Sequence, residues 1–332
     1  MDKRRKFIGK LGTGIISALA LPATDLFANS KIKNIRASTN KKKNIRIGII
    51  GAENSHARGY GKLFNIDKKF PGMEVMYIWG ETKEFAKDAM ERGGIPNMVE
   101  DQMEMLGKID ALIVDHRHAK YHLDAALPFV EEGIPTFIDK PFCYRASNGL
   151  EFLKIAREKG TPVSSFSSLA QSDGTFDMKK QIDAMDGINH VVCYGPVDVE
   201  SEYGGIFFYG VHMVQQMINI FGENIDRVRI SRNNKNTTAS IAYQSGMMVT
   251  LIFINKFYGW ETYIEQDKGL IQLKSRVEEP DPPRHYVDMV EMFRSGKEPR
   301  SYQSILNCVS VLEALERSVA NQKWEAVKFV SI

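Results

Sequence analysis

The chain has 332 residues, which exceeds the size of one compact core and indicates two domains of ordinary size. Hydrophobic residues make up 43% and charged residues 26%, proportions that are typical of a soluble globular enzyme and exclude wholesale disorder, collagen and coiled coil. The three cysteines, Cys143, Cys193 and Cys308, are odd in number and widely separated, which excludes a disulfide framework and a paired-cysteine metal site.

The charge of the chain is unevenly distributed. Residues 1–43 hold eleven of the 44 basic side chains and two of the 41 acidic ones, so residues 44–332 carry 33 basic and 39 acidic side chains. The body of the protein is therefore acidic. This balance argues against nucleic acid or an anionic membrane surface as a general partner.

The first residues have the pattern of an export signal over 1–28. Arg4 and Arg5 are followed by Phe7, then by a short apolar run and by small residues that end at Ala28. This pattern is similar to a twin-arginine signal and predicts a periplasmic or otherwise exported protein, with no membrane attachment once the signal is removed. Residues 29–43 are expected to form a flexible linker. A disordered basic tail on a cytoplasmic enzyme is the alternative.

Short apolar runs alternate with helix-length amphipathic segments between residues 44 and 163. The runs at 45–50, 75–79, 111–114 and 136–138 are expected to be strands, and the segments at 57–66, 82–92 and 121–132 to be helices. This alternation predicts an α/β Rossmann-like domain with a doubly wound parallel sheet.

The pattern changes in residues 164–332. Longer, partly alternating strands are expected at 189–194, 228–233, 237–243, 247–257 and 262–273, with a helix over 209–221. Helices over 284–294 and 302–321 follow and are expected to return to the first domain. The second domain is therefore predicted to be α+β, with an open, largely antiparallel sheet that serves substrate binding and oligomerisation.

Three motifs carry a family resemblance. A strand that ends in Asp139-Lys140-Pro141 follows an opening strand that ends in Gly51, and Gly204-Gly205 precedes His212 in the second domain. Together with the closing helices, these motifs resemble the Gfo/Idh/MocA family of glucose–fructose oxidoreductase and inositol dehydrogenase, over roughly residues 44–330. The resemblance implies a homo-oligomeric oxidoreductase that uses NAD or NADP to act on the CH–OH group of a small carbohydrate or polyol.

In such a reaction hydride leaves a carbinol carbon while a base removes the hydroxyl proton. Lys140 follows a buried strand, where burial would destabilise its ammonium, and His212 could face it across the cleft. We therefore expect Lys140 and His212 to handle the proton. The residues expected to bind the cofactor follow the ends of parallel strands, where ligands bind in such sheets: Gly51, Ala52, Asn54, Ser55, His56, Glu81, His116, Asp139 and Lys140.

The sequence also departs from the family pattern. Glu53 and His56 stand where the dinucleotide fingerprint has its second and third glycines, and Phe208 stands where the family often has an aspartate. A carboxylate beside a diphosphate is repulsive, and a side chain there obstructs close approach of the backbone.

These replacements leave two alternatives open. His56, His116 and His118 could converge as metal ligands, with Asp115 nearby, in a metal-assisted lyase or hydrolase that has lost the dinucleotide. The other alternative is a non-catalytic carbohydrate-binding relative. His122, one helical turn beyond His118, is expected to support the site residues or to pack within the helix.

Overall fold

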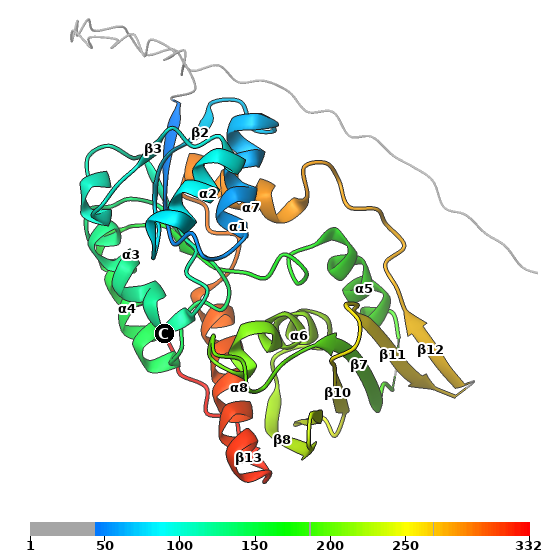
Figure 1. Ribbon diagram of the computed structural model, residues 1–332. Helices are drawn as coiled ribbons and strands as arrows, with labels where there is room; N and C mark the ends of the chain where they lie inside the picture. The colour runs from blue at the N-terminus through cyan, green and yellow to red at the C-terminus, as the bar shows by residue number, and fades with distance from the viewer. Residues whose placement is uncertain (1–43, 186, 268) are drawn as a thin grey trace, which may run out of the picture. The chain divides into compact units, whose positions relative to one another are not determined.

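The computed structural model describes residues 44–185, 187–267 and 269–332 (Figure 1). The predicted export signal at 1–28 and the predicted linker at 29–43 lie outside the described residues. Among the helices of the described part, none combines the length and the apolar character needed to cross a membrane.

The first sheet is parallel and six-stranded, in the order β3-β2-β1-β4-β5-β6. Its strands are β1 (Ile45–Ile50), β2 (Met73–Trp79), β3 (Asn97–Met98), β4 (Ala111–Val114), β5 (Thr136–Ile138) and β6 (Val163–Ser164). The four predicted strands are confirmed, with β2 starting two residues earlier than expected. The two-residue edge strands β3 and β6 are too short for a periodicity to reveal them.

Alternation along the central strands divides the core between the two faces of this sheet. Ile47 and Ile49 pack into one cluster of buried side chains, whereas Ile50 and Val114 pack into the other. Figure 1 shows α1 and α2 on one face and α3 and α4 on the other. These helices are α1 (His56–Gly61), which continues as a π-helical turn over Lys62–Ile66, α2 (Lys83–Gly93), α3 (His122–Glu131) and α4 (Ala146–Lys159).

The second sheet is seven-stranded, in the order β12-β11-β7-β10-β9-β8-β13. Its strands are β7 (His190–Pro196), β8 (Ile225–Asn233), β9 (Asn236–Tyr243), β10 (Met248–Ile254), β11 (Glu261–Gln266), β12 (Gly269–Leu273) and β13 (Glu325–Ala326). The sheet is antiparallel except where β7 pairs with β10. The single strand expected over 262–273 is wrong, because the chain reverses between β11 and β12 and forms a hairpin.

Helices cover one face of the second sheet and also return to the first sheet. They are α5 (Asp173–Asp183), α6 (Ile206–Phe221), α7 (Arg284–Ser295) and α8 (Tyr302–Asn321), and short 3₁₀ turns lie at Gln102–Met105 and Ala119–Tyr121. Met289 and Phe293 of α7 pack in the same cluster as Ile47 of the first sheet. Helix α6 starts at Ile206, three residues earlier than predicted, which places His212 in its second turn.

Candidate active site

A glycine at the end of β1 sets the geometry of the site. Gly51 has a φ of +102°, and a Cβ atom on it would lie 2.6 Å from the backbone of Asp115. Only glycine lets the β1 loop approach the end of β4 this closely. The close approach brings Asn54 and His56 against the residues that follow β4 and β5.

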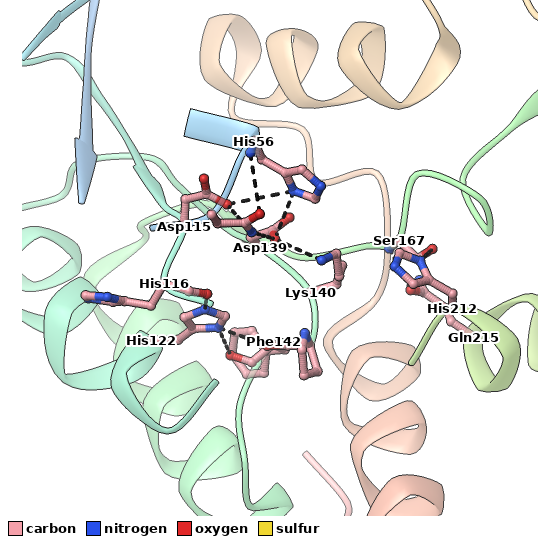
Figure 2. A network of polar contacts seen from close by, with 12 residues as sticks. His56, Asp115, His116, His122, Asp139, Lys140, Phe142, Ser167, His212 and Gln215 are labelled. Atoms are coloured by element: carbon pink, nitrogen blue, oxygen red, sulfur yellow. Dashed lines mark hydrogen bonds and ion pairs between the residues drawn. The ribbon is translucent and has the colours of Figure 1, made fainter. Parts of the chain in front are cut away.

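A network of charged side chains lies at this edge of the sheet (Figure 2). The amide of Asn54 donates hydrogen bonds to Asp115 Oδ1 at 3.0 Å and to Asp139 Oδ2 at 3.2 Å. His56 Nδ1 lies 3.2 Å from Asp139 Oδ2, and Lys140 Nζ lies 3.5 Å from the same oxygen. Asp115, Asp139 and Lys140 are buried, so each charge here depends on its neighbours.

The two carboxyl groups differ in protonation. Burial and the neighbouring charge of Asp139 raise the pKa of Asp115 well above its usual range. Burial also acts to raise the pKa of Asp139, but the charges of Lys140 and His56 outweigh it and bring the pKa below its usual range. The negative charge of the pair is therefore favoured on Asp139, the carboxylate nearer to Lys140 Nζ.

His212 extends this site from the second domain. Its Nδ1 lies 2.6 Å from Ser167 Oγ, while the backbone N–H of Ser167 donates to Gln215 Oε1 at 2.7 Å. Burial, and then the charge of Lys140, lower the pKa of His212 well below its usual range, so the ring is neutral. Because Ser167 fixes the ring through Nδ1, Nε2 remains available to a ligand; it has no hydrogen-bond partner among the described residues.

The predicted cofactor residues also lie together at the ends of β1, β2 and β4. Glu81 Oε2 accepts the backbone N–H groups of Ala52 at 2.9 Å and of Glu53 at 3.0 Å, and Oε1 lies 2.7 Å from His116 Nδ1. Burial opposes the ionisation of Glu81, but the hydrogen bonds from His116 and the loop bring its pKa to about 2. The N–H groups of Asn54 and Ser55 have no acceptor within the described part of the chain.

Glu53 is directed at the second domain. Its Oε1 accepts a hydrogen bond of 2.8 Å from Tyr203 Oη, and Arg117 donates to the same hydroxyl at 3.1 Å while its guanidinium lies 4.1 Å from the centre of the Tyr203 ring. Tyr203 and Arg117 thus compensate the negative charge of Glu53 on the side of the second domain, and the carboxylate does not engage the free N–H groups of the loop. With those two N–H groups as phosphate donors and Glu81 as a ribose acceptor, the residues present fit a dinucleotide.

The alternative metal site of three histidines is not formed. His116 points to Glu81, and His118 Nδ1 instead accepts the N–H of Lys120 at 3.2 Å while its ring contacts Tyr144. The described residues that do come within metal-ligating reach of one another are His56, Asp115 and Asp139. Asn54 donates to one oxygen of each carboxyl group and Lys140 Nζ lies near Asp139 Oδ2, whereas Asp115 Oδ2 is buried without a hydrogen-bond partner among the described residues.

His122 is a buried residue that contacts two segments of the site, in agreement with the supporting or packing role expected for it. It is fully buried, and its two ring nitrogens lie 2.8 Å from the carbonyl oxygen of His116 and 2.9 Å from that of Pro141. The side chain therefore ties the segment after β4 to the segment after β5, which carries Lys140. Burial lowers the pKa of His122 to about 4.

Two cavities border the site. One of about 260 Å³ is lined by Lys140, Asp139, His56, Ser168 and His285. The other, of about 700 Å³, lies on the second domain and includes Phe208 in its wall. Sequence reasoning did not find Ser167, Tyr203 or His285, because each stands outside any motif and reaches the site only through the packing of the two domains.

The fold defines a two-domain α/β class of protein, with one parallel six-stranded sheet and one open mixed sheet. Residues 45–166 match the Gfo/Idh/MocA model, described as an oxidoreductase family with an NAD-binding Rossmann fold. The first domain is therefore similar to the Gfo/Idh/MocA family, in agreement with the resemblance stated from the motifs. No curated protein matches the chain.

Solved structures share both domains. Myo-inositol dehydrogenase from Lactobacillus casei, in complex with NAD(H) and myo-inositol, has a TM-score of 0.73 at 15% identity, over 87% of this chain and 98% of that one. Myo-inositol 2-dehydrogenase from Lactobacillus plantarum has a TM-score of 0.72 at 16% identity, over 86% and 100%. Scyllo-inositol dehydrogenase from L. casei, with NAD(H) and scyllo-inositol, has a TM-score of 0.71 at 16% identity, over 86% and 99%. These likenesses show that the two-domain fold is common to all four proteins.

Proposed function

We propose that this protein is an oxidoreductase that uses NAD or NADP to act on a CH–OH group of a sugar or polyol. The observation that carries the proposal is the convergence of Lys140 and His212, from different domains, beside the cavity of about 260 Å³ that Lys140 lines and the free N–H groups of the β1 loop. The family of the first domain and the inositol dehydrogenases with the same fold support it.

In the proposed reaction the chain's own residues handle the hydroxyl proton. When bound, a nicotinamide dinucleotide supplies the ring that accepts hydride from the carbinol carbon. Lys140 Nζ binds the reacting hydroxyl and stabilises its oxygen as the proton leaves, and the ionised Asp139 holds that ammonium in place. His212 Nε2 accepts the proton, since its ring is neutral and Ser167 orients it. The substrate is left as a ketone or aldehyde.

The experiment measures dinucleotide binding by calorimetry, and NADH or NADPH formation with a panel of inositols and hexoses. Lys140→Ala is expected to lower kcat by about 10²–10⁴-fold. Lys120→Ala, which removes an exposed lysine of the same domain, is the matched control and should match the wild type. Protein that binds neither dinucleotide contradicts the proposal. So does protein that holds a stoichiometric transition metal by elemental analysis and turns over a carbohydrate without a nucleotide.

We further propose that the protein is exported through the twin-arginine route and forms a homo-oligomer. The paired arginines at residues 4 and 5 support export, and the family resemblance supports the oligomer. Arg4→Lys combined with Arg5→Lys should leave precursor in the cytoplasm, and secretion at the normal level would contradict this route. Light scattering of the purified protein measures the oligomeric state, and a monomer would contradict the second proposal.

A further inference from the structure

The larger cavity has an aromatic wall that the proposed reaction does not use. The rings of Tyr203, Phe208, Tyr209 and Tyr258 line it and contact one another in sequence. Their centres are 5.0 Å apart for Tyr203 and Phe208, 4.9 Å for Phe208 and Tyr209, and 6.4 Å for Tyr209 and Tyr258. Tyr258 is 71% exposed, yet its ring also contacts that of Trp260. The Tyr258 ring is exposed but is fixed between the rings of Tyr209 and Trp260, so it forms a preformed surface for a flat ligand.

The same wall borders the catalytic pair. The Phe208 ring centre lies 5.7 Å from Lys140 Nζ, and the Tyr209 ring centre lies 5.5 Å from that of His212. A ligand against Phe208 and Tyr209 is therefore adjacent to the groups that would act on a carbinol. The rings of Phe208 and Tyr209 thus connect the wall of the large cavity to the reaction site.

Hydrogen-bonding groups also line the cavity, beside a few aliphatic side chains. Asp198, Glu202 and Asn255 supply acceptors and donors, and Arg232 is fixed there by an ion pair with Glu200 at 2.6 Å. A ligand that suits this lining has one flat apolar face for the rings and hydroxyl groups along its edges. A pyranose ring has this distribution, with its axial C–H bonds on a face and its hydroxyl groups around the rim.

Cavity size indicates how many rings the site takes. The cavity beside Lys140 measures about 260 Å³, below the range of sites for drug-sized ligands, whereas the aromatic cavity measures about 700 Å³, well within it. We propose that the aromatic cavity binds a second sugar ring, so that the substrate is a glycoside or disaccharide rather than a free monosaccharide. This inference rests on the proposed function for the chemistry at Lys140, but it concerns a binding site that is measured independently of turnover.

The test measures calorimetric affinities of the full chain for cellobiose, lactose and maltose, each against glucose and galactose, with and without NAD. At least one disaccharide is expected to bind about tenfold more tightly than its component monosaccharides. Tyr258→Ala should weaken that disaccharide by about tenfold and affect the monosaccharides less, because it removes a ring of the outer wall only. Phe257→Ala is the matched control, since Phe257 is 60% exposed and adjacent in the chain but does not line the cavity.

The outcomes separate this inference from the proposed function. Disaccharide binding that depends on Tyr258, without any dinucleotide turnover, supports the second-ring site and contradicts the oxidoreductase. Equal affinity for disaccharides and monosaccharides, or equal effects of Tyr258→Ala and Phe257→Ala, overturns the second-ring site even where oxidation is measured. A shift of the Tyr258→Ala variant to a smaller oligomer also overturns it, because the rings would then form a contact between subunits.

Discussion

The carboxylate of Glu53 accepts a hydrogen bond of 2.8 Å from the hydroxyl of Tyr203, and this bond joins the loop after β1 to the loop before α6. Glu53 occupies the place of a fingerprint glycine, where the sequence alone predicts a conflict with a diphosphate. The structure gives the carboxylate a donor on the other domain, and Arg117 adds a positive charge at the same hydroxyl.

The first prediction concerns this bond. Tyr203→Phe keeps the ring but removes the donor, so the charge of Glu53 is less compensated and NAD should bind about fivefold more weakly. Glu53→Gln should act in the opposite direction and tighten NAD binding, because it removes a negative charge from the vicinity of the diphosphate. Calorimetric titration with NAD measures both effects.

Tyr263→Phe is the control for that experiment, since Tyr263 donates a comparable hydrogen bond of 2.6 Å to Glu261 on the second sheet. It should leave the Kd for NAD unchanged. Weaker binding in Glu53→Gln would contradict the account, because it would mean that the carboxylate itself assists the cofactor.

Glu81 provides a pH-dependent test. Its folded-state pKa of about 2 lies below the ordinary 4.5, so its ionised form stabilises the fold above pH 4.5, and this contribution is lost as the pH falls towards about 2. Glu81→Gln should lower the free energy of unfolding at pH 7 by about 1–2 kcal/mol, allowing for solvent screening of a partly exposed carboxylate. Urea unfolding at a series of pH values measures the difference between the two proteins, which should shrink below pH 4.5.

Glu100→Gln is the control for Glu81→Gln, because it makes the same change in a glutamate that pairs with Lys83 on the surface. Surface pairs contribute little, so its unfolding free energy should stay within about 0.5 kcal/mol of the wild type. A Glu81→Gln protein with the same stability as the wild type at pH 7 would show that the loop N–H groups do not depend on this carboxylate.

The central strands of the fold could be predicted because their signals are local. The runs that became β4 and β5 are apolar and stop at polar residues, whereas the run that became β1 stops at Gly51, and these ends placed Asp139 and Lys140 at the correct edge. The hairpin of β11 and β12 was missed because residues 262–273 alternate like one long strand. Only Asp267 and Gly269 mark the turn. Helix α5 was missed because it has little apolar surface, and the N-cap hydrogen bond that Ser172 Oγ accepts from the N–H of Thr175 is visible only in the structure.

Only those site residues could be predicted whose place in a sequence motif determines where they lie in the fold. Lys140 and His212 stand in motifs, whereas the relation of Ser167 to His212 and that of Tyr203 to Glu53 depend on how the domains pack. The three-histidine interpretation was wrong for a similar reason. Alternation along an extended segment predicts that His116 and His118 share a face, but the chain bends at Arg117 and His118, and each ring has a different partner.

The orientation of His212 can be tested through Ser167. Ser167→Ala removes the partner of Nδ1 but keeps the backbone bond to Gln215, so the fold should persist while kcat falls by about tenfold, with a smaller change in KM. Since burial lowers the pKa of His212 well below 6.5, the wild type should lose no activity near pH 6.5 through protonation of this ring. Steady-state kinetics across pH measure both, and a Ser167→Ala protein with unchanged kcat would remove the positioning role.

His122 gives the last prediction, in which stability and pH are linked. Its folded pKa of about 4 lies below the 6.5 of an exposed histidine, so the unfolded chain takes up a proton first as the solution is acidified. The wild type should therefore lose stability between pH 6.5 and about 4, by up to about 3 kcal/mol from this residue. His122→Gln should unfold about 2 kcal/mol more easily at pH 7, because it disturbs the hydrogen bond that the single N–H of the neutral ring donates to the carbonyl group of His116 or of Pro141. The difference in unfolding free energy between the wild type and His122→Gln should become smaller as the pH falls, since the variant has no imidazole ring to protonate. Urea unfolding of both proteins at pH 7 and at pH 5 measures this difference. A difference that is the same at both pH values would contradict a neutral, buried His122.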